Sequence, residues 1–225
     1  MRRVLSFYGT TVGKKVAMAG SGGLLLLFVL GHMIGNLKVY QGPEAYNAYA
    51  EGLREAGAPL LSHGELLWIA RILLLAALLI HVTAAIQLTR ISRTARSMGY
   101  ARTPHEEISY ASRTVRWGGT IIFLFVVYHL LHLTWGTVHP AFVRGDVYHN
   151  FVAGFQVWPV SVVYMLGMIV LGLHIYHGTW SMMQTLGIDP PRYGRYRRPF
   201  AALVALVIVA GNLSFPLAVL LGVVR

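Results

Sequence analysis

The chain contains no cysteine among its 225 residues. This absence excludes disulfide bonds, thiolate metal sites, iron–sulfur clusters and the C-x-x-C-H attachment of c-type haem. Any redox cofactor bound by this protein must therefore be held by histidine. Internal repeats, a phosphate-binding glycine loop and a nucleophile elbow are absent as well.

Charged residues are scarce, and hydrophobic residues take their place. Only 12% of the residues are charged, 56% are hydrophobic and the mean hydropathy is +0.57, which is too apolar for an ordinary soluble domain. Stretches long enough to cross a hydrocarbon core about 30 Å thick lie at about 15–37, 65–89, 117–136, 158–183 and 199–224. Because lipid cannot satisfy backbone amides, these stretches must be helices. The sequence predicts an all-α membrane protein, with residues 1–225 forming a single domain, a bundle of five transmembrane helices.

The basic residues predict the orientation of this bundle. Of the 19 lysines and arginines, 14 lie in the N-terminal segment and in the loops after the second and fourth spans. Since such segments are typically cytoplasmic, we expect a cytoplasmic N-terminus and a C-terminus outside. The opening MRRVLSF lacks an A-x-A-like cleavage site nearby, so we expect it to be retained. The net charge of +11 is concentrated at the membrane edge, where it would meet anionic lipid or an acidic partner; no nucleic-acid partner is expected.

Histidine is the informative residue type. Six of the ten histidines lie inside predicted spans, with one or two on each of the first four helices and none on the fifth. They are His32, His81, His129, His132, His174 and His177. Ionisable residues at membrane depth are costly and usually functional. A hydrogen bond to a neighbouring helix would explain any single one, but the pattern over four helices points to a shared function.

Four of these histidines fall at two depths in the predicted topology. His32 and His129 lie about 9 and 4 Å from the midpoints of their spans toward the outside, at 1.5 Å per residue. His81 and His174 lie roughly 6 and 5 Å from theirs toward the cytoplasm. One histidine from each of four helices, paired at two depths, is the arrangement needed to ligate two haem irons, one above the other.

Geometry alone leaves the choice between His174 and His177 open. The two lie only about 60° apart around the helix, so both face the same side. Depth from the span midpoint slightly favours His174, whereas counting from Gln87 and Gln184 at the inner ends favours His177.

Several short motifs occur in a particular order. They are HMIGN at 32–36, GPEAYN at 42–47, R-x-x-G at 116–119, YH at 128–129 and H-x-x-x-G-x-W-S at 174–181. With this order and spacing, the chain from about residue 15 to 190 resembles the di-haem cytochrome b membrane subunit of succinate:quinone oxidoreductase. The resemblance implies that His32 and His129 ligate an outer haem and that His81 and His174 ligate an inner haem. Its last motif favours His174 over the neighbouring histidine.

The resemblance also implies a function. Such a subunit anchors succinate dehydrogenase (complex II) in the bacterial plasma membrane as a multi-pass protein, bound to an iron–sulfur subunit that is joined to the succinate-oxidising flavoprotein subunit. The chain would pass electrons through two non-covalent b haems to a membrane quinone, commonly menaquinone, in the respiratory chain and the tricarboxylic acid cycle. It would be the electron-transfer subunit of an enzyme whose succinate site lies on a partner, and a higher-order oligomer of the complex is a further expectation.

Other residues are candidates for the cofactor and quinone sites. Arg71, at membrane depth, and Arg116, within the family pattern, are expected to pair with haem propionates, although Arg116 also suits a positive-inside anchor. His177 and His132 are expected beside a cofactor and not on the iron. Quinone reduction consumes protons, and we choose Glu65, at the membrane edge of the second span, as the quinone and proton site. The alternative for Glu65 is a solvated loop carboxylate.

Three other functions remain open from sequence alone. The chain could be the haem b anchor of another quinone-linked dehydrogenase or hydrogenase, which copurification would reveal. It could be a proton or metal transporter that uses the histidines as a relay, which predicts a colourless protein. It could also be a structural anchor without a cofactor, against which the four-helix histidine pattern argues.

Overall fold

The five predicted spans are all helical in the computed structural model, which describes residues 2–95, 110–188 and 194–225. The described residues contain no strand. Helices long and apolar enough to cross a membrane cover Thr11–Gln41, Glu65–Thr94, Trp117–Thr134, Trp158–Thr185 and Gly194–Leu220. The first, second and fourth extend beyond the predicted limits, because a helix can continue past the end of its apolar stretch. The third ends at Thr134, two residues early, and the fifth both begins and ends earlier than the predicted 199–224. The all-α transmembrane fold is confirmed.

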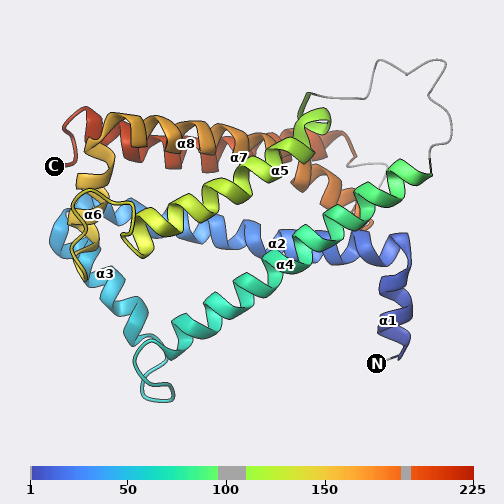
Figure 1. Ribbon diagram of the computed structural model, residues 1–225, viewed down its shortest axis with the longest axis horizontal. Coiled ribbons are helices and arrows are strands. Elements are labelled where there is room, and N and C mark those ends of the chain that lie inside the picture. Colours follow the sequence, from blue (N-terminus) through green and yellow to red (C-terminus); the bar gives the residue numbers. More distant parts are fainter. Residues whose placement is uncertain (1, 96–109, 189–193) are drawn as a thin grey trace.

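The long helices run in alternating directions along one bundle (Figure 1). They are α2 (Thr11–Asn36), α4 (Glu65–Thr94), α5 (Tyr110–His129), α7 (Trp158–Thr185) and α8 (Arg197–Leu220). The short helix α1 (Arg2–Gly9) lies at one end, and α3 (Pro43–Glu55) and α6 (Val147–Gln156) lie at the other (Figure 1). We call these the α1 end and the α3/α6 end. The chain termini lie at opposite ends of the bundle.

Helices α2 and α7 form the centre of the bundle. Helix α2 packs against α4, α7 and α8, while α7 also packs against α5 and α8. The α7–α8 contact is close because small residues line it: a Cβ atom at Gly172 would collide with Val209, and Ala201 and Ala205 are buried. Helix α4 packs against α2 and, more weakly, against α3. These contacts bring the four histidine-bearing helices together.

The largest cluster of buried side chains lies at the α3/α6 end, and the sequence did not predict the two short helices there. Helix α3 begins at Pro43, directly after Gly42 with a φ of 93°, a conformation that favours glycine. Its buried Tyr46 contacts Phe151 of α6 edge to face, with ring centroids 5.7 Å apart. Burial raises the pKa of Tyr46, so its hydroxyl stays protonated and donates to Asn36 Oδ1 at 2.7 Å.

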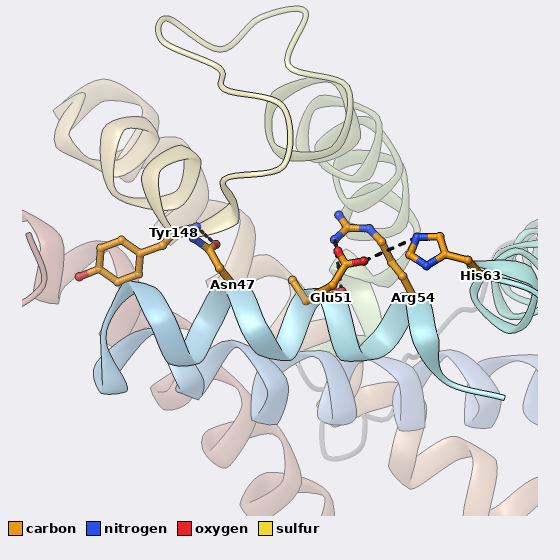
Figure 2. A network of polar contacts seen from close by, with 6 residues as sticks. Asn47, Glu51, Arg54, His63 and Tyr148 are labelled. Carbon is orange, nitrogen blue, oxygen red and sulfur yellow. Dashed lines mark hydrogen bonds and ion pairs between the residues drawn. The ribbon is translucent and has the colours of Figure 1, made fainter. Parts of the chain in front are cut away.

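Polar contacts connect α3 to the segments beside it (Figure 2). Asp146 caps α6 by accepting the backbone N–H of His149 at 2.9 Å and the side-chain amide of Asn47 at 3.0 Å. These two bonds hold the pKa of the Asp146 carboxyl below its usual value. Further along α3, Glu51 accepts from Arg54 at 2.7 Å and lies 3.7 Å from His63 in the loop before α4. The loops on this side are thereby held against α3.

The outer surface of the spans is apolar, as expected for contact with lipid. Large exposed side chains on different spans include Leu27, Ile72, Leu79, Leu124, Leu166 and Leu206. Trp117 and Trp135, near the two ends of the third span, are 76% and 60% exposed. Exposed tryptophans at span ends are typical of the interface between lipid and water. The surface therefore agrees with a multi-pass membrane protein.

Candidate functional site

Two histidine rings face each other toward the α3/α6 end. His32 of α2 and His129, the last residue of α5, have ring centroids 5.9 Å apart at an interplanar angle of 84°. Each ring stacks on a phenylalanine one turn earlier on its own helix: Phe28 lies 5.3 Å from His32, and Phe125 lies 6.2 Å from His129. Residues four apart on a helix are neighbours, so each phenylalanine helps to fix its histidine.

A second pair of rings lies toward the α1 end. His81 of α4 and His174 of α7 have ring centroids 6.1 Å apart at an interplanar angle of 70°. The Nδ1 atom of His81 lies 3.1 Å from the Met18 carbonyl oxygen, which can only accept. The proton of His81 is therefore on Nδ1, and its Nε2 keeps a free lone pair. The Nδ1 atom of His174 is buried without a hydrogen-bond partner among the described residues.

The separation of the two histidine pairs can be estimated from residue numbers along α2 and α7. On α2, Gly22 lies against the ring of His81 and is ten residues before His32. On α7, the Tyr164 hydroxyl lies 3.3 Å from His129 Nδ1, and Tyr164 is ten residues before His174. Ten residues of α-helix span about 15 Å. Both helices therefore place one pair about 15 Å above the other along the bundle.

The ring separation of each pair is compatible with a haem iron between the rings. A metal bound by two opposite imidazoles lies about 2 Å from each nitrogen, which puts the ring centroids about 6 Å apart. The observed separations are 5.9 and 6.1 Å. Within residues 2–95, 110–188 and 194–225, no three His, Cys, Asp or Glu side chains cluster so that they could hold a metal ion. Rings in opposed pairs suit the axial ligands of haem, whose porphyrin supplies the other ligands.

His132 lies beside the first pair but has different contacts. It sits in η2 (Leu130–Thr134), a π-helical turn that follows His129, and it is completely buried. Its ring stacks on Tyr128 at 5.6 Å and on His139 at 4.8 Å, and its Nδ1 lies 3.0 Å from the Tyr164 hydroxyl. His132 is therefore packed among Tyr128, His139 and Tyr164, and its place beside a cofactor stays a prediction.

The ring of His177 has different neighbours from the ring of His174. Its ring contacts Trp180 edge to face at 6.0 Å, and the Arg198 guanidinium lies 4.9 Å over the same tryptophan. The structure places the ring of His174, and not that of His177, opposite His81. This contact agrees with His174 as the ring opposite His81, and the assignment of His174 as a ligand stays a prediction.

The remaining predicted site residues lie away from these ring contacts. Arg71 is exposed on α4, with its guanidinium 4.9 Å over the ring of Trp68. Glu65, the first residue of α4, is exposed and accepts the backbone N–H of Ser62 at 2.9 Å. Arg116 belongs to α5, but its side chain lies outside the described part of the structure. None of the described contacts joins Arg71 or Glu65 to the histidine pairs.

Sequence reasoning missed Tyr164 and His139. Tyr164 lies in an apolar span, where it reads as one more core aromatic, and His139 lies in a loop. A signal for the histidine environments was nevertheless present: an aromatic residue precedes His32, His129 and His132 by four positions. This spacing puts the aromatic ring and the imidazole on one helix face.

Comparison with known proteins identifies the family. Residues 93–213 match the family described as succinate dehydrogenase/fumarate reductase transmembrane subunit, and this match covers more than half of the chain. The chain belongs to this family. The match includes His129 and His174, while His32 and His81 precede it. Neither the curated proteins nor the solved structures provided a match. The chain is therefore a membrane subunit of a succinate dehydrogenase/fumarate reductase complex, as the sequence motifs predicted.

Proposed function

We propose that this transmembrane subunit binds two b haems and passes electrons from an iron–sulfur subunit to a membrane quinone. One haem would lie between His32 and His129 and the other between His81 and His174. The observation that carries the proposal is the pair of facing imidazoles at each of two levels, with ring separations of 5.9 and 6.1 Å. Family membership supports the electron-transfer part of this proposal, because succinate oxidation releases electrons and fumarate reduction consumes them.

The distribution of charge supports a cytoplasmic α1 end. Basic residues of the described chain gather at this end on three segments. They are Lys14, Lys15, Arg90, Arg93, Arg195, Arg197 and Arg198. Cytoplasmic edges of membrane proteins are enriched in lysine and arginine. We therefore call the haem of His81 and His174 the inner haem and that of His32 and His129 the outer haem, and the iron–sulfur and flavoprotein subunits would bind at the α1 end.

The residues of this chain have defined tasks in the proposed transfer. Bound haem supplies one-electron chemistry, and its potential depends on its axial ligands, its burial and the hydrogen bonds to those ligands. The four histidines would hold two haem irons at two levels about 15 Å apart. The Met18 carbonyl favours the His81 tautomer with its proton on Nδ1, which would leave Nε2 available to hold a haem iron. With two histidines on each iron, no position would be left open for oxygen.

Quinone reduction requires two electrons and two protons for each quinone. We propose Glu65 as the proton-carrying group, because it begins α4 beside the α3/α6 end and its carboxylate is exposed. Menaquinone is the proposed acceptor, in line with the di-haem subunits that the sequence resembles. Arg71 and Arg116 remain the proposed partners of haem propionates, and His177 remains a proposed neighbour of a propionate or of quinone at the α1 end.

Copurification tests the proposed complex. The tagged chain, solubilised from its native membrane, is expected to bring down an iron–sulfur protein and a flavoprotein, with succinate:quinone reductase activity in the same fraction. A second preparation, tagged on an unrelated membrane protein, controls for loose association. Recovery of a hydrogenase or a formate-oxidising enzyme in place of the flavoprotein would assign the chain to a different quinone-linked complex.

Gly22→Val is predicted to lose the inner haem. A Cβ atom at Gly22 would lie 3.0 Å from His81 Cε1, and the methyl groups of valine would push the ring out of line with His174. Gly20→Val is a matched control, since a Cβ atom there meets nothing within 4 Å. We expect haem to fall from roughly two to roughly one per chain for Gly22→Val and to stay unchanged for Gly20→Val. Equal haem content in both variants would contradict the inner site.

A further inference from the structure

We infer that Tyr164 positions His129 and sets the potential of the outer haem through a hydrogen-bond chain to the buried His132. The inference rests on the proposed function and adds a residue that the sequence motifs do not contain. Tyr164 belongs to α7, and its side chain is only 5% exposed. Its hydroxyl lies 3.3 Å from His129 Nδ1 and 3.0 Å from His132 Nδ1. One hydroxyl thus serves two imidazoles.

The Tyr164 hydroxyl can both donate and accept hydrogen bonds, so it can link the two histidines in a hydrogen-bond chain. A tyrosine hydroxyl has a single proton and can also accept, so it can donate to one imidazole while it accepts from the other. If His129 binds iron through Nε2 as a neutral imidazole, its proton is on Nδ1 and is donated to Tyr164. Tyr164 can then donate its own proton to His132 Nδ1. The shorter distance, 3.0 Å, belongs to this second bond.

His132, at the far end of this hydrogen-bond chain, is held in place by packing. The ring of His132 lies between Tyr128 and His139, with ring centroids 5.6 and 4.8 Å away. His139 is itself fixed, because its Nε2 donates to the Asn150 carbonyl at 2.8 Å and its Nδ1 accepts the Ala141 N–H at 3.0 Å. His132 therefore cannot swing away from Tyr164 without disturbing this stack.

Tyr164, in the middle of the hydrogen-bond chain, is also fixed by ring contacts. The ring of Tyr164 contacts Phe125 at 5.2 Å and Phe155 at 4.9 Å, both edge to face. The π-helical turn η2 begins directly after His129 and brings His132 Nδ1 to the hydroxyl that His129 already approaches. π-helical turns are rare and are frequently found at functional sites. Two histidines three residues apart thus share a single partner on the neighbouring helix.

The expected consequence is specific to one haem. An axial histidine that donates its Nδ1–H to an acceptor becomes a more basic ligand, which stabilises oxidised iron and lowers the potential. At the outer haem the acceptor is the Tyr164 hydroxyl, whereas at the inner haem it is the Met18 carbonyl. Loss of the Tyr164 hydroxyl should therefore raise the potential of the outer haem and leave the inner one unchanged.

Redox titration of the complete complex tests the inference. Tyr164→Phe removes only the hydroxyl, and we expect roughly two haems per chain, an upward shift of the outer potential and an altered electron paramagnetic resonance signal of that haem. His129→Ala, which should leave only the inner haem, identifies which potential belongs to which haem. Tyr128→Phe is the matched control: it removes a neighbouring hydroxyl, keeps the ring on His132 and should leave both potentials unchanged.

A second pair of variants tests the chain from its other end. His132→Asn places an amide oxygen near the position of Nδ1 and should keep the outer potential of the parent protein. His132→Leu removes the acceptor and should shift it, and this pair decides the matter if Tyr164→Phe fails to assemble. An unchanged outer potential in both Tyr164→Phe and His132→Leu would overturn the inference while leaving the proposed function intact. A parent complex without haem would instead overturn the proposed function.

Discussion

His174→Ala is expected to remove the inner haem and to leave the outer haem in place. The variant deletes one of two facing imidazoles, and no other imidazole takes its position, because the ring of His177 is turned toward Trp180. Haem extracted from the purified complex should fall from roughly two to roughly one per chain. Electron transfer from succinate to quinone should be lost, since in the proposed function the inner site would lie between the iron–sulfur subunit and the outer site.

His177→Ala is the matched control for this prediction, because it lies one turn further along the same helix. It should retain both haems, with at most a shifted inner potential. His81→Ala should reproduce the loss seen with His174→Ala, since the two residues face each other at 6.1 Å. Full haem content in His174→Ala together with a loss in His177→Ala would reverse the assignment of the ligand.

His129→Ala is expected to remove the outer haem and to spare the inner one. His129 faces His32 at 5.9 Å, so alanine at either position leaves a single imidazole at this level. The inner pair lies about 15 Å away along the bundle and should keep its iron. Redox titration should then show one transition, at the potential of the inner haem.

His132→Ala provides the contrast at the α3/α6 end. His132 is completely buried and packs behind the facing pair, so its loss should cost stability through a cavity but should not remove an iron ligand. We expect both haems to be present, with the outer potential changed. Retention of both haems in His129→Ala, His32→Ala, His81→Ala and His174→Ala alike would refute the ligand assignment as a whole.

The five transmembrane helices can be predicted from the sequence, whereas the short helices α3 and α6 cannot. A helix that must cross lipid needs about 20 apolar residues, and this requirement marks each span clearly. Helices α3 and α6 have only 13 and 10 residues, and they are stabilised by tertiary contacts such as that between Tyr46 and Phe151. Such contacts between segments about a hundred residues apart leave no local periodic signal.

The pairing of the histidines could also be predicted, because the constant rise of a helix converts residue number into depth. The other neighbours and hydrogen-bond partners of each imidazole could not be predicted. The selection of His174 over His177 depends on how α7 is rotated about its axis, and the Met18 carbonyl is a backbone atom that any residue would supply. The π-helical turn after His129 changes the direction of His132, and α-helical spacing does not anticipate that change.

A haem measurement on the purified protein tests the central claim most directly. The reduced-minus-oxidised absorbance spectrum and the haem content should be recorded on the full chain isolated with its partner subunits. The facing pairs His32–His129 and His81–His174 predict a b-type spectrum and roughly two haems per chain. A colourless chain would contradict the account, and the paired histidines would then need a different explanation.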